Sequence, residues 1–132
     1  MICKKNSKNI VKNHKVFLKS HIRYKHLKSK ENLEMKIEID RAYVEYKEDI
    51  CEEDTIEISM LYVPFENRGN KLGYRLLEEV KEWSINNGYT KLSLCAYPQE
   101  DNGMTTEELV EYYRLFGFEQ FENSEIMFME IV

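Results

Sequence analysis

Apolar and polar residues alternate in several short segments of the chain, whereas apolar residues recur with helical spacing in two longer segments. Alternation is typical of half-buried strands, and a spacing of three to four residues is typical of helices with one buried face. The expected strands cover residues 36–39, 42–46, 55–63, 92–96, 118–121 and 126–131, and the expected helices cover 72–83 and 109–116. This order predicts an α/β (α+β) fold with flanking helices.

Local signals mark the ends of these elements. Asp40 and Arg41 form the expected turn between the first two strands, and residues 49–54 form an acidic loop. Residues 86–88, Asn-Asn-Gly, end the first helix, and Gly117 ends the second. Thr105 and Glu108 have the spacing of a capping box, which predicts the start of the second helix.

The strand over residues 55–63 has apolar residues at even positions: Ile56, Ile58, Met60 and Tyr62. Strict alternation places these four side chains on one face of the sheet. The same alternation places Glu57, Ser59 and Leu61 on the opposite face.

A short loop joins this strand to the first helix and has the sequence Arg68-Gly69-Asn70-Lys71-Leu72-Gly73. The first amides of a helix have no internal partner and carry the positive end of its dipole. A strand, a glycine-bearing turn and a helix therefore form a cradle for phosphate groups. The loop alone is a weak signal, because many turns imitate it.

Charge divides the chain into two parts. Residues 1–30 contain ten of the 19 Lys and Arg residues and none of the 24 Asp and Glu residues, so a segment of +10 precedes a body of −15. We interpret residues 1–34 as a basic N-terminal extension, mobile or loosely docked, and residues 35–132 as one compact domain. The extension is typical of a nucleic-acid arm, a partner-docking segment or a solvated tail.

Several classes of protein are disfavoured. The chain has no apolar run long enough to span a membrane and no signal peptide, so we expect a cytoplasmic protein. Its three cysteines, Cys3, Cys51 and Cys95, lie far from any paired metal-ligand spacing. We therefore expect reduced thiols and no metal site.

The strand, the phosphate loop and the segment Tyr112-Tyr113-Arg114-Leu115-Phe116-Gly117-Phe118 resemble, in this order, the GCN5-related N-acetyltransferase (GNAT) superfamily over about residues 35–132. In that family the loop carries Arg or Gln, two spacers, Gly, one spacer, and Gly or Ala. Arg68 and Gly73 match this pattern, but Lys71 occupies the first glycine position. The resemblance implies an N-acetyltransferase that uses acetyl-CoA, with a mostly antiparallel sheet in which the strand ending at Val63 splays from the strand over residues 92–97.

The resemblance also implies roles for individual residues. The backbone of Leu61, Tyr62 and Val63 would grip the pantetheine arm, and an amide near Leu61 or Tyr62 would stabilise the developing negative charge on the acetyl oxygen. Residues 68–73 would bind the pyrophosphate. Tyr113, four residues before Gly117, is the candidate proton donor to the departing sulfur, and Tyr112 is its less favoured neighbour.

Two further side chains have candidate roles. Glu57 is a candidate general base, for which it needs a raised pKa; an ordinary solvated glutamate with proton loss through water is equally consistent with the sequence. Cys95 has no histidine nearby in the sequence, so we interpret it as a buried thiol rather than a nucleophile.

Three functions remain open at this stage. The segments 35–38, 96–99 and 107–113 resemble short phage acetyltransferases, among them an anti-CRISPR factor that modifies a lysine of a DNA-targeting nuclease. The chain is therefore an N-acetyltransferase acting on a primary amine such as a protein lysine, an anti-CRISPR lysine acetyltransferase, or a noncatalytic binding module that uses residues 1–30 on nucleic acid or a protein. Neither the acceptor nor the oligomeric state follows from the sequence.

Overall fold

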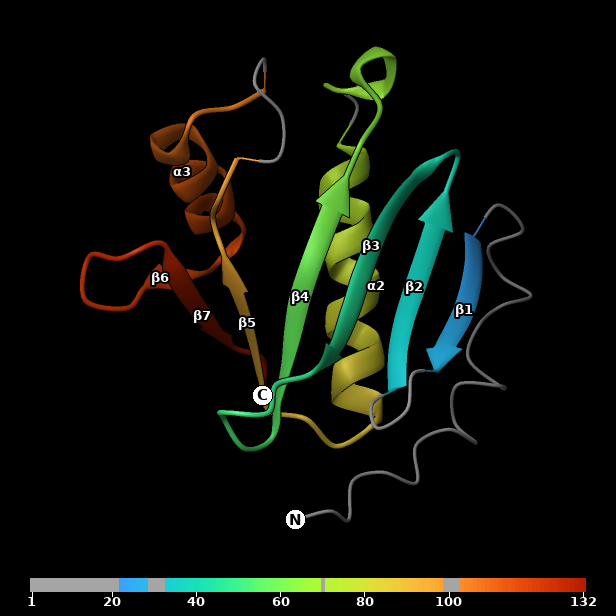
Figure 1. Ribbon diagram of the computed structural model, residues 1–132, viewed down its shortest axis with the longest axis vertical. Coiled ribbons are helices and arrows are strands. Elements are labelled where there is room, and N and C mark those ends of the chain that lie inside the picture. Colours follow the sequence, from blue (N-terminus) through green and yellow to red (C-terminus); the bar gives the residue numbers. More distant parts are fainter. Residues whose placement is uncertain (1–21, 29–32, 70, 99–102) are drawn as a thin grey trace.

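The computed structural model describes residues 22–28, 33–69, 71–98 and 103–132. Within these residues, seven strands form one sheet in the order β1-β2-β3-β4-β5-β7-β6 (Figure 1). The strands are β1 (Ile22–Lys28), β2 (Leu33–Ile39), β3 (Ala42–Glu48), β4 (Thr55–Tyr62), β5 (Lys91–Cys95), β6 (Glu119–Gln120) and β7 (Ile126–Glu130), and the helices are the 3-10 turn η2 (Phe65–Asn67), α2 (Leu72–Asn86) and α3 (Thr106–Phe116). The β4–β5 pair is parallel and the other pairs are antiparallel, which confirms the predicted mixed, mostly antiparallel sheet.

Helix α2 packs against β2, β3 and β4, and it lies behind β3 and β4 in Figure 1. Its buried apolar side chains are Leu72, Leu76, Leu77, Val80 and Trp83. They meet alternate residues of β2 and β3, such as Ile37 and Val44, which are fully buried. The rings of Tyr46 and Trp83 meet edge to face, with centroids 5.2 Å apart. This packing fixes the start of α2 beside the end of β4.

The predicted start of α3 and the predicted turn between β2 and β3 are confirmed. Thr105 Oγ1 accepts a hydrogen bond from the amide of Glu108 (3.1 Å), and the Glu108 carboxylate accepts one from the amide of Thr105 (2.9 Å), which completes the capping box. Asp40 and Arg41 both have positive φ angles, 49° and 73°, so they form a tight turn between β2 and β3. Short-range sequence signals were sufficient at these sites.

A β-bulge interrupts the regular alternation of β4. Tyr46 pairs with Ile58, but the preceding residue of β3, Glu45, pairs with Met60. Ser59 is therefore an extra residue on β4, and its hydroxyl donates a hydrogen bond to the carbonyl of Glu45 (3.2 Å). A bulge of this kind bends the strand and reverses the facing of the residues that follow it.

The predicted facing of the second half of β4 is consequently wrong. Leu61 pairs with the fully buried Val44, so it shares the α2 face of the sheet. Met60 and Tyr62 point to the opposite face, where the rings of Tyr62 and Tyr43 lie 5.5 Å apart. Strict alternation failed because it assumes that β4 has no bulge.

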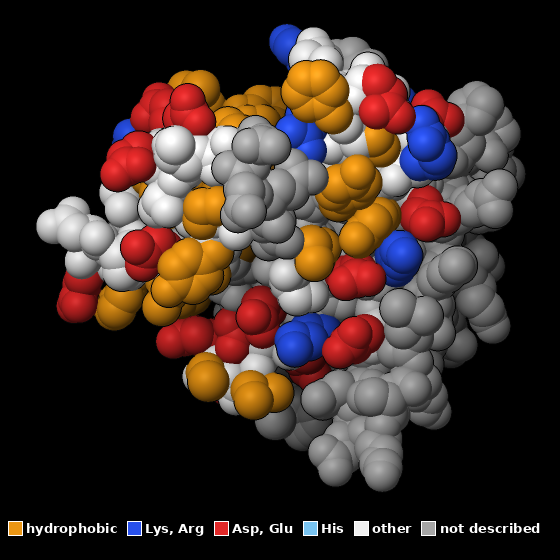
Figure 2. Space-filling view, turned by 45° about the horizontal axis from the view of Figure 1, so that its top comes forward, with side chains coloured by type: hydrophobic (Ala, Val, Ile, Leu, Met, Phe, Trp, Pro, Cys, Tyr) orange, Lys and Arg blue, Asp and Glu red, His pale blue; other side chains and the backbone are white. Residues whose placement is uncertain are grey.

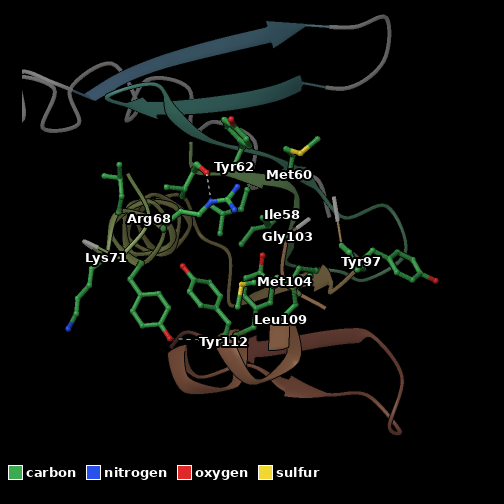
Figure 3. A pocket seen from close by; sticks show the side chains of 18 of the residues that line it. Ile58, Met60, Tyr62, Arg68, Lys71, Tyr97, Gly103, Met104, Leu109 and Tyr112 are labelled. Carbon is green, nitrogen blue, oxygen red and sulfur yellow. Dashed lines mark hydrogen bonds between the residues drawn. The ribbon is translucent and has the colours of Figure 1, made fainter. Parts of the chain in front are cut away.

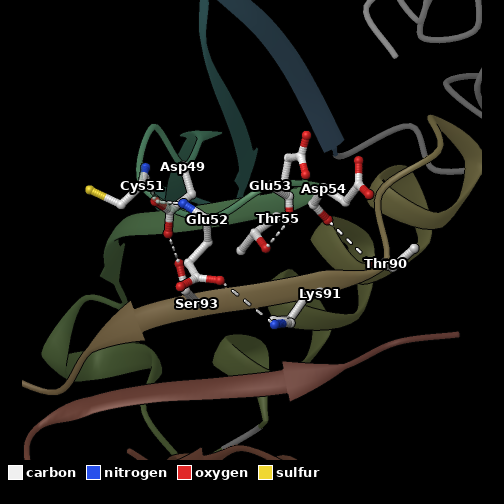
Figure 4. A network of polar contacts seen from close by, with 9 residues as sticks. All are labelled: Asp49, Cys51, Glu52, Glu53, Asp54, Thr55, Thr90, Lys91 and Ser93. Carbon is white, nitrogen blue, oxygen red and sulfur yellow. Dashed lines mark hydrogen bonds and ion pairs between the residues drawn. The ribbon is translucent and has the colours of Figure 1, made fainter. Parts of the chain in front are cut away.

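The acidic loop over residues 49–54 is held by its own hydrogen bonds (Figure 4). The Asp49 carboxylate accepts from the amides of Cys51 (2.8 Å) and Glu52 (3.2 Å), and from the hydroxyl of Ser93 on β5 (2.8 Å). No group of three or more His, Cys, Asp or Glu residues in the described ranges is arranged to hold a metal ion. The loop, which connects β3 to β4, is thus tied to β5 through the Asp49–Ser93 hydrogen bond.

The sheet extends into the segment that we assigned to the N-terminal extension. β1 pairs with β2 along its whole length, from Ile22 opposite Ile39 to Lys28 opposite Leu33. Residues 1–21 lie outside the described part of the chain. The expectation of a mobile segment concerns these residues and therefore falls outside the described part as well. No helix in the described part is long and apolar enough to cross a membrane.

Candidate active site

The strands β4 and β5 diverge, as the sequence resemblance implied. Their parallel pairing ends at Ile58 opposite Leu94, although β4 continues to Tyr62. Beyond β5, the amide of Ala96 donates to the carbonyl of Glu125 (2.9 Å), so the chain follows β7 instead of β4. Figure 1 shows β4 and β5 separating toward their C-terminal ends. Among the described residues, the backbone of residues 59–62 is consequently left without a strand partner on the β5 side.

A cavity of about 470 Å³ lies at this divergence (Figure 3). Its volume is within the usual range for sites that bind small molecules. Eight of the predicted binding residues line it: Leu61, Tyr62, Val63, Arg68, Gly69, Lys71, Leu72 and Gly73. Tyr113 also lines the cavity, whereas Glu57 does not. Asn70 lies outside the described residues.

The N-terminus of α2 faces this cavity. The first bond within the helix runs from the amide of Arg75 to the carbonyl of Lys71 (3.1 Å), and no side chain caps the helix at Lys71. The amides of Leu72, Gly73 and Tyr74 therefore have no carbonyl of the helix to bind, and they carry the positive end of its dipole. This arrangement suits an anionic group such as a pyrophosphate.

The loop before α2 is tied to the rest of the sheet. Arg68 Nε donates a hydrogen bond to the carbonyl of Val63 (2.8 Å). The Asn67 side chain donates to the carbonyl of Asp40 (3.3 Å), and Arg41 forms an ion pair with Glu66 (2.8 Å). These contacts hold residues 66–68 against the β2–β3 turn and the end of β4.

Tyr113 on α3 lies at the inner wall of the cavity. Its side chain is 8% exposed, and its ring meets that of Phe118 edge to face at 5.8 Å. Burial raises the pKa of Tyr113 to about 12. The phenol therefore remains protonated near neutrality and is suited to donate a proton rather than to accept one.

Residues 37–118 match the model of the acetyltransferase (GNAT) family. The chain belongs to this family. It is an N-acetyltransferase by family, and its co-substrate is acetyl-CoA. No curated protein matches the chain in sequence.

Solved structures with the GNAT fold resemble this chain. The anti-CRISPR protein AcrVA5 is 31% identical, with a TM-score of 0.61 over 72% of this chain and 96% of its own. The PaiA N-acetyltransferase of Thermoplasma acidophilum, in complex with coenzyme A, is 23% identical, with a TM-score of 0.54 over 75% of this chain and 60% of its own. An aminoglycoside 6'-N-acetyltransferase with coenzyme A is 15% identical, with a TM-score of 0.58 over 75% and 73%.

The residues of this GNAT chain fit the co-substrate. The amides at the start of α2 that have no carbonyl of the helix to bind suit the pyrophosphate, and the edge of β4 beyond its pairing with β5 offers backbone groups to the amides of the pantetheine arm. Bound acetyl-CoA supplies an activated acetyl thioester. The chain must then position the thioester and an amine, and must supply a proton to the leaving sulfur.

Cys95 differs from the sequence prediction. It is a free, exposed thiol at the end of β5 and lines the cavity, whereas we expected it to be buried. Partial burial of the thiol, and then the carboxylates of Glu125 and Glu57, raise its pKa. Few thiolates form near neutrality, so Cys95 is poorly suited to act as a nucleophile.

Glu57 lies beside the cavity instead of in its wall. It pairs with Lys47 on β3 and Ser93 on β5, and its side chain is half-buried on the sheet face away from α2. Its carboxylate is nevertheless close enough to Cys95 to raise the pKa of that thiol. Glu57 therefore shares this sheet face with Cys95, which lines the cavity.

The alternation and loop signals did not identify Tyr97, Met104 and Leu109 as cavity residues. Tyr97 and Met104 flank residues 99–102, which lie outside the described part of the chain, and Leu109 is on α3. The helical spacing of residues 109–116 indicated a buried face, but it did not indicate that part of this face borders a cavity.

Lys71 adopts a left-handed conformation, with φ 63° and ψ 23°, where the family pattern has glycine. Such a conformation costs a residue with a Cβ about 1–2 kcal/mol. We expect Lys71→Gly to raise the free energy of unfolding by about 0.5–1 kcal/mol, because the added flexibility of the unfolded chain offsets part of the relief. Urea denaturation would measure this change. Lys71→Ala is the control, because it removes the charge and keeps the Cβ; equal stabilisation by both variants would contradict the explanation by backbone strain.

Proposed function

We propose that the chain transfers the acetyl group of acetyl-CoA to a primary amine, such as the lysine side chain of a protein. One arrangement carries this proposal: a single cavity joins the start of α2, the free edge of β4 and the Tyr113 phenol. In the reaction the amine nitrogen bonds to the acetyl carbon, and the carbon–sulfur bond breaks. The nitrogen loses a proton and the sulfur gains one, so the reaction is balanced without a metal or a redox partner.

The cavity lining supports the following proposed binding roles. The loop over residues 68–73 holds the pyrophosphate, and the backbone of Leu61, Tyr62 and Val63 holds the pantetheine arm. An amide near Leu61 or Tyr62 stabilises the negative charge that develops on the acetyl oxygen. Tyr113 donates its phenolic proton to the sulfur as the carbon–sulfur bond breaks.

The amine approaches from the sheet face away from α2. Two carboxylate residues lie close to the cavity residue Cys95: Glu57 pairs with Ser93, and the carbonyl of Glu125 accepts from the amide of Ala96. Figure 2 shows acidic side chains beside an apolar area, with Lys and Arg side chains among them. An ammonium group is attracted to such a surface. Glu57 then accepts the proton of the amine, directly or through water.

A screen of acceptors tests this proposal. Purified chain is incubated with acetyl-CoA and with a lysine peptide, a polyamine or an aminoglycoside, and release of free thiol is recorded. We expect thiol release with at least one of these amines and none with the same acceptor after complete dimethylation. Binding of acetyl-CoA without thiol release in any reaction would favour the noncatalytic alternative.

The similarity to AcrVA5 favours a more specific candidate, acetylation of a lysine on a CRISPR nuclease. The similarity covers 96% of the AcrVA5 chain. Its sequence identity of 31% exceeds the 23% and 15% of the other two structures described above. Incubation of DNA-targeting CRISPR nucleases with the chain and acetyl-CoA, followed by mass spectrometry and DNA-cleavage assays, tests this role. Acetylation of free lysine peptides with every nuclease left unmodified would contradict it.

We further propose that residues 22–132 form the folded unit and that residues 1–21 are a basic extension. Deletion of residues 1–21 should leave a cooperative thermal transition and binding of coenzyme A. Deletion of residues 1–34 should lower the melting temperature, because it removes β1 and its ladder with β2. Equal melting temperatures for the two truncated proteins would contradict a structural role of β1. If residues 1–21 bind nucleic acid, their deletion should abolish a salt-sensitive affinity.

A further inference from the structure

We infer that Tyr112 is a further binding residue for acetyl-CoA, whose hydroxyl donates a hydrogen bond to the pyrophosphate at the first turn of α2. This inference rests on the proposed use of α2 as the pyrophosphate site. The family pattern assigned the adjacent Tyr113 to the chemistry and left Tyr112 without a role. Both tyrosines line the same cavity, although they reach different parts of its wall.

The position of the Tyr112 hydroxyl is defined by Gly73. A Cβ atom built on Gly73 would overlap Tyr112 Oη and would lie 3.4 Å from Tyr112 Cζ. The next atom is a methyl carbon of Val63, at 3.7 Å. The hydroxyl thus lies beside Gly73, the second residue of α2, whose amide is one of the three that have no carbonyl of the helix to bind. Figure 3 shows the Tyr112 side chain between α3 and the start of α2.

Contacts on several sides hold the Tyr112 ring in this position. Its centroid lies 4.9 Å from that of Tyr74 on α2 and 5.3 Å from that of Tyr113. The Tyr74 hydroxyl donates a hydrogen bond to the carbonyl of Tyr112 (2.9 Å), which ties α3 to the first turn of α2. The hydroxyl of Tyr112 itself forms no hydrogen bond with the residues that the structure describes.

The electrostatic environment makes this hydroxyl a donor. Burial, and then the neighbouring phenols of Tyr113 and Tyr74, raise the pKa of Tyr112 well above its ordinary value. It therefore remains protonated near neutrality. A neutral donor beside the positive end of a helix suits an anionic oxygen, because the hydrogen atoms of the O–H and of the helix amides carry partial positive charge. The pantetheine arm is uncharged, so this donor set suits the phosphorylated part of acetyl-CoA. We assign it to the pyrophosphate, because the proposed site at the start of α2 holds that group.

Calorimetric titration of Tyr112→Phe tests the inference, with coenzyme A and pantetheine as two ligands. Pantetheine keeps the arm and lacks the phosphorylated adenosine part, which includes the pyrophosphate. We expect about tenfold weaker binding of coenzyme A, as for the loss of one hydrogen bond to a charged group, and unchanged binding of pantetheine. Tyr43→Phe is the matched control, because it removes a hydroxyl from a tyrosine that does not line the cavity. It should bind both ligands like the wild type.

The other outcomes overturn the inference. Unchanged affinity of Tyr112→Phe for coenzyme A would show that the hydroxyl does not contact the co-substrate. Equal weakening for both ligands would show that it acts through packing of the cavity. If the wild type binds coenzyme A but acetylates no amine, the proposed function fails while the tenfold effect on coenzyme A is still expected. Absence of coenzyme A binding by the folded wild type would overturn both.

A second variant checks the geometry without any ligand. Gly73→Ala should lower the melting temperature in the wild-type background, because its Cβ meets the Tyr112 hydroxyl. The same substitution should cost less in the Tyr112→Phe background, where the nearest remaining ring atom is at an ordinary contact distance. Equal costs in both backgrounds would contradict the placement of the hydroxyl.

Discussion

Replacement of Tyr113 by phenylalanine is expected to lower kcat about a hundredfold to ten-thousandfold, the usual contribution of a general acid. The ring and its packing against Phe118 remain, so the fold and the affinity for coenzyme A should change little. The pKa of about 12 keeps the phenol protonated. In the wild type, deprotonation of this tyrosine should therefore not lower kcat between about pH 7 and 10.

Steady-state thiol release measures this effect, with Tyr43→Phe as the control for loss of a hydroxyl away from the cavity. An acetyl thioester with a more acidic leaving thiol separates proton donation from other roles, because a better leaving group needs less protonation. The deficit of Tyr113→Phe should shrink with that thioester. Wild-type turnover of the variant, under conditions where chemistry limits the rate, would exclude Tyr113 as the proton donor.

Replacement of Gly73 by valine is expected to weaken binding of coenzyme A by at least about a hundredfold, the effect of losing two hydrogen bonds to a charged group. The valine side chain would enter the space beside the amides of α2 and displace the Tyr112 hydroxyl. Both donor groups for the pyrophosphate would then be obstructed. Titration calorimetry with coenzyme A measures the loss.

The control for this experiment is Glu78→Val, which adds the same β-branched side chain at an exposed position of α2. It should bind coenzyme A like the wild type, since position 78 does not line the cavity. Circular dichroism and thermal melting show whether each variant is folded. A folded Gly73→Val protein with wild-type affinity would remove the start of α2 from the binding site.

Much of the fold could be predicted because its signals are local. The capping box at Thr105, the turn at Asp40 and Arg41, and the helix over residues 72–86 each depend on residues within a few positions of one another. The loop and the tyrosine segment occur in a characteristic order, which was enough to indicate the family. The placement of both segments around one cavity agrees with that order.

The remaining features depend on contacts between distant parts of the chain. The bulge at Ser59 is defined by the register with β3, so alternation within β4 could not reveal it. The exposure of Cys95 results from the divergence of β5 from β4. The contact of the Tyr112 hydroxyl with Gly73 joins two helices, and nothing in the sequence near either residue indicates it.

The central claim is that one cavity binds acetyl-CoA and passes its acetyl group to an amine. The most direct measurement incubates the purified chain with acetyl-CoA and a lysine peptide, and quantifies both free coenzyme A and acetylated peptide. We predict equal amounts of the two products, formed by the wild type and almost absent with Gly73→Val. Coenzyme A bound in the cavity, with neither thiol nor acetylated amine produced from any acceptor tested, would contradict the claim.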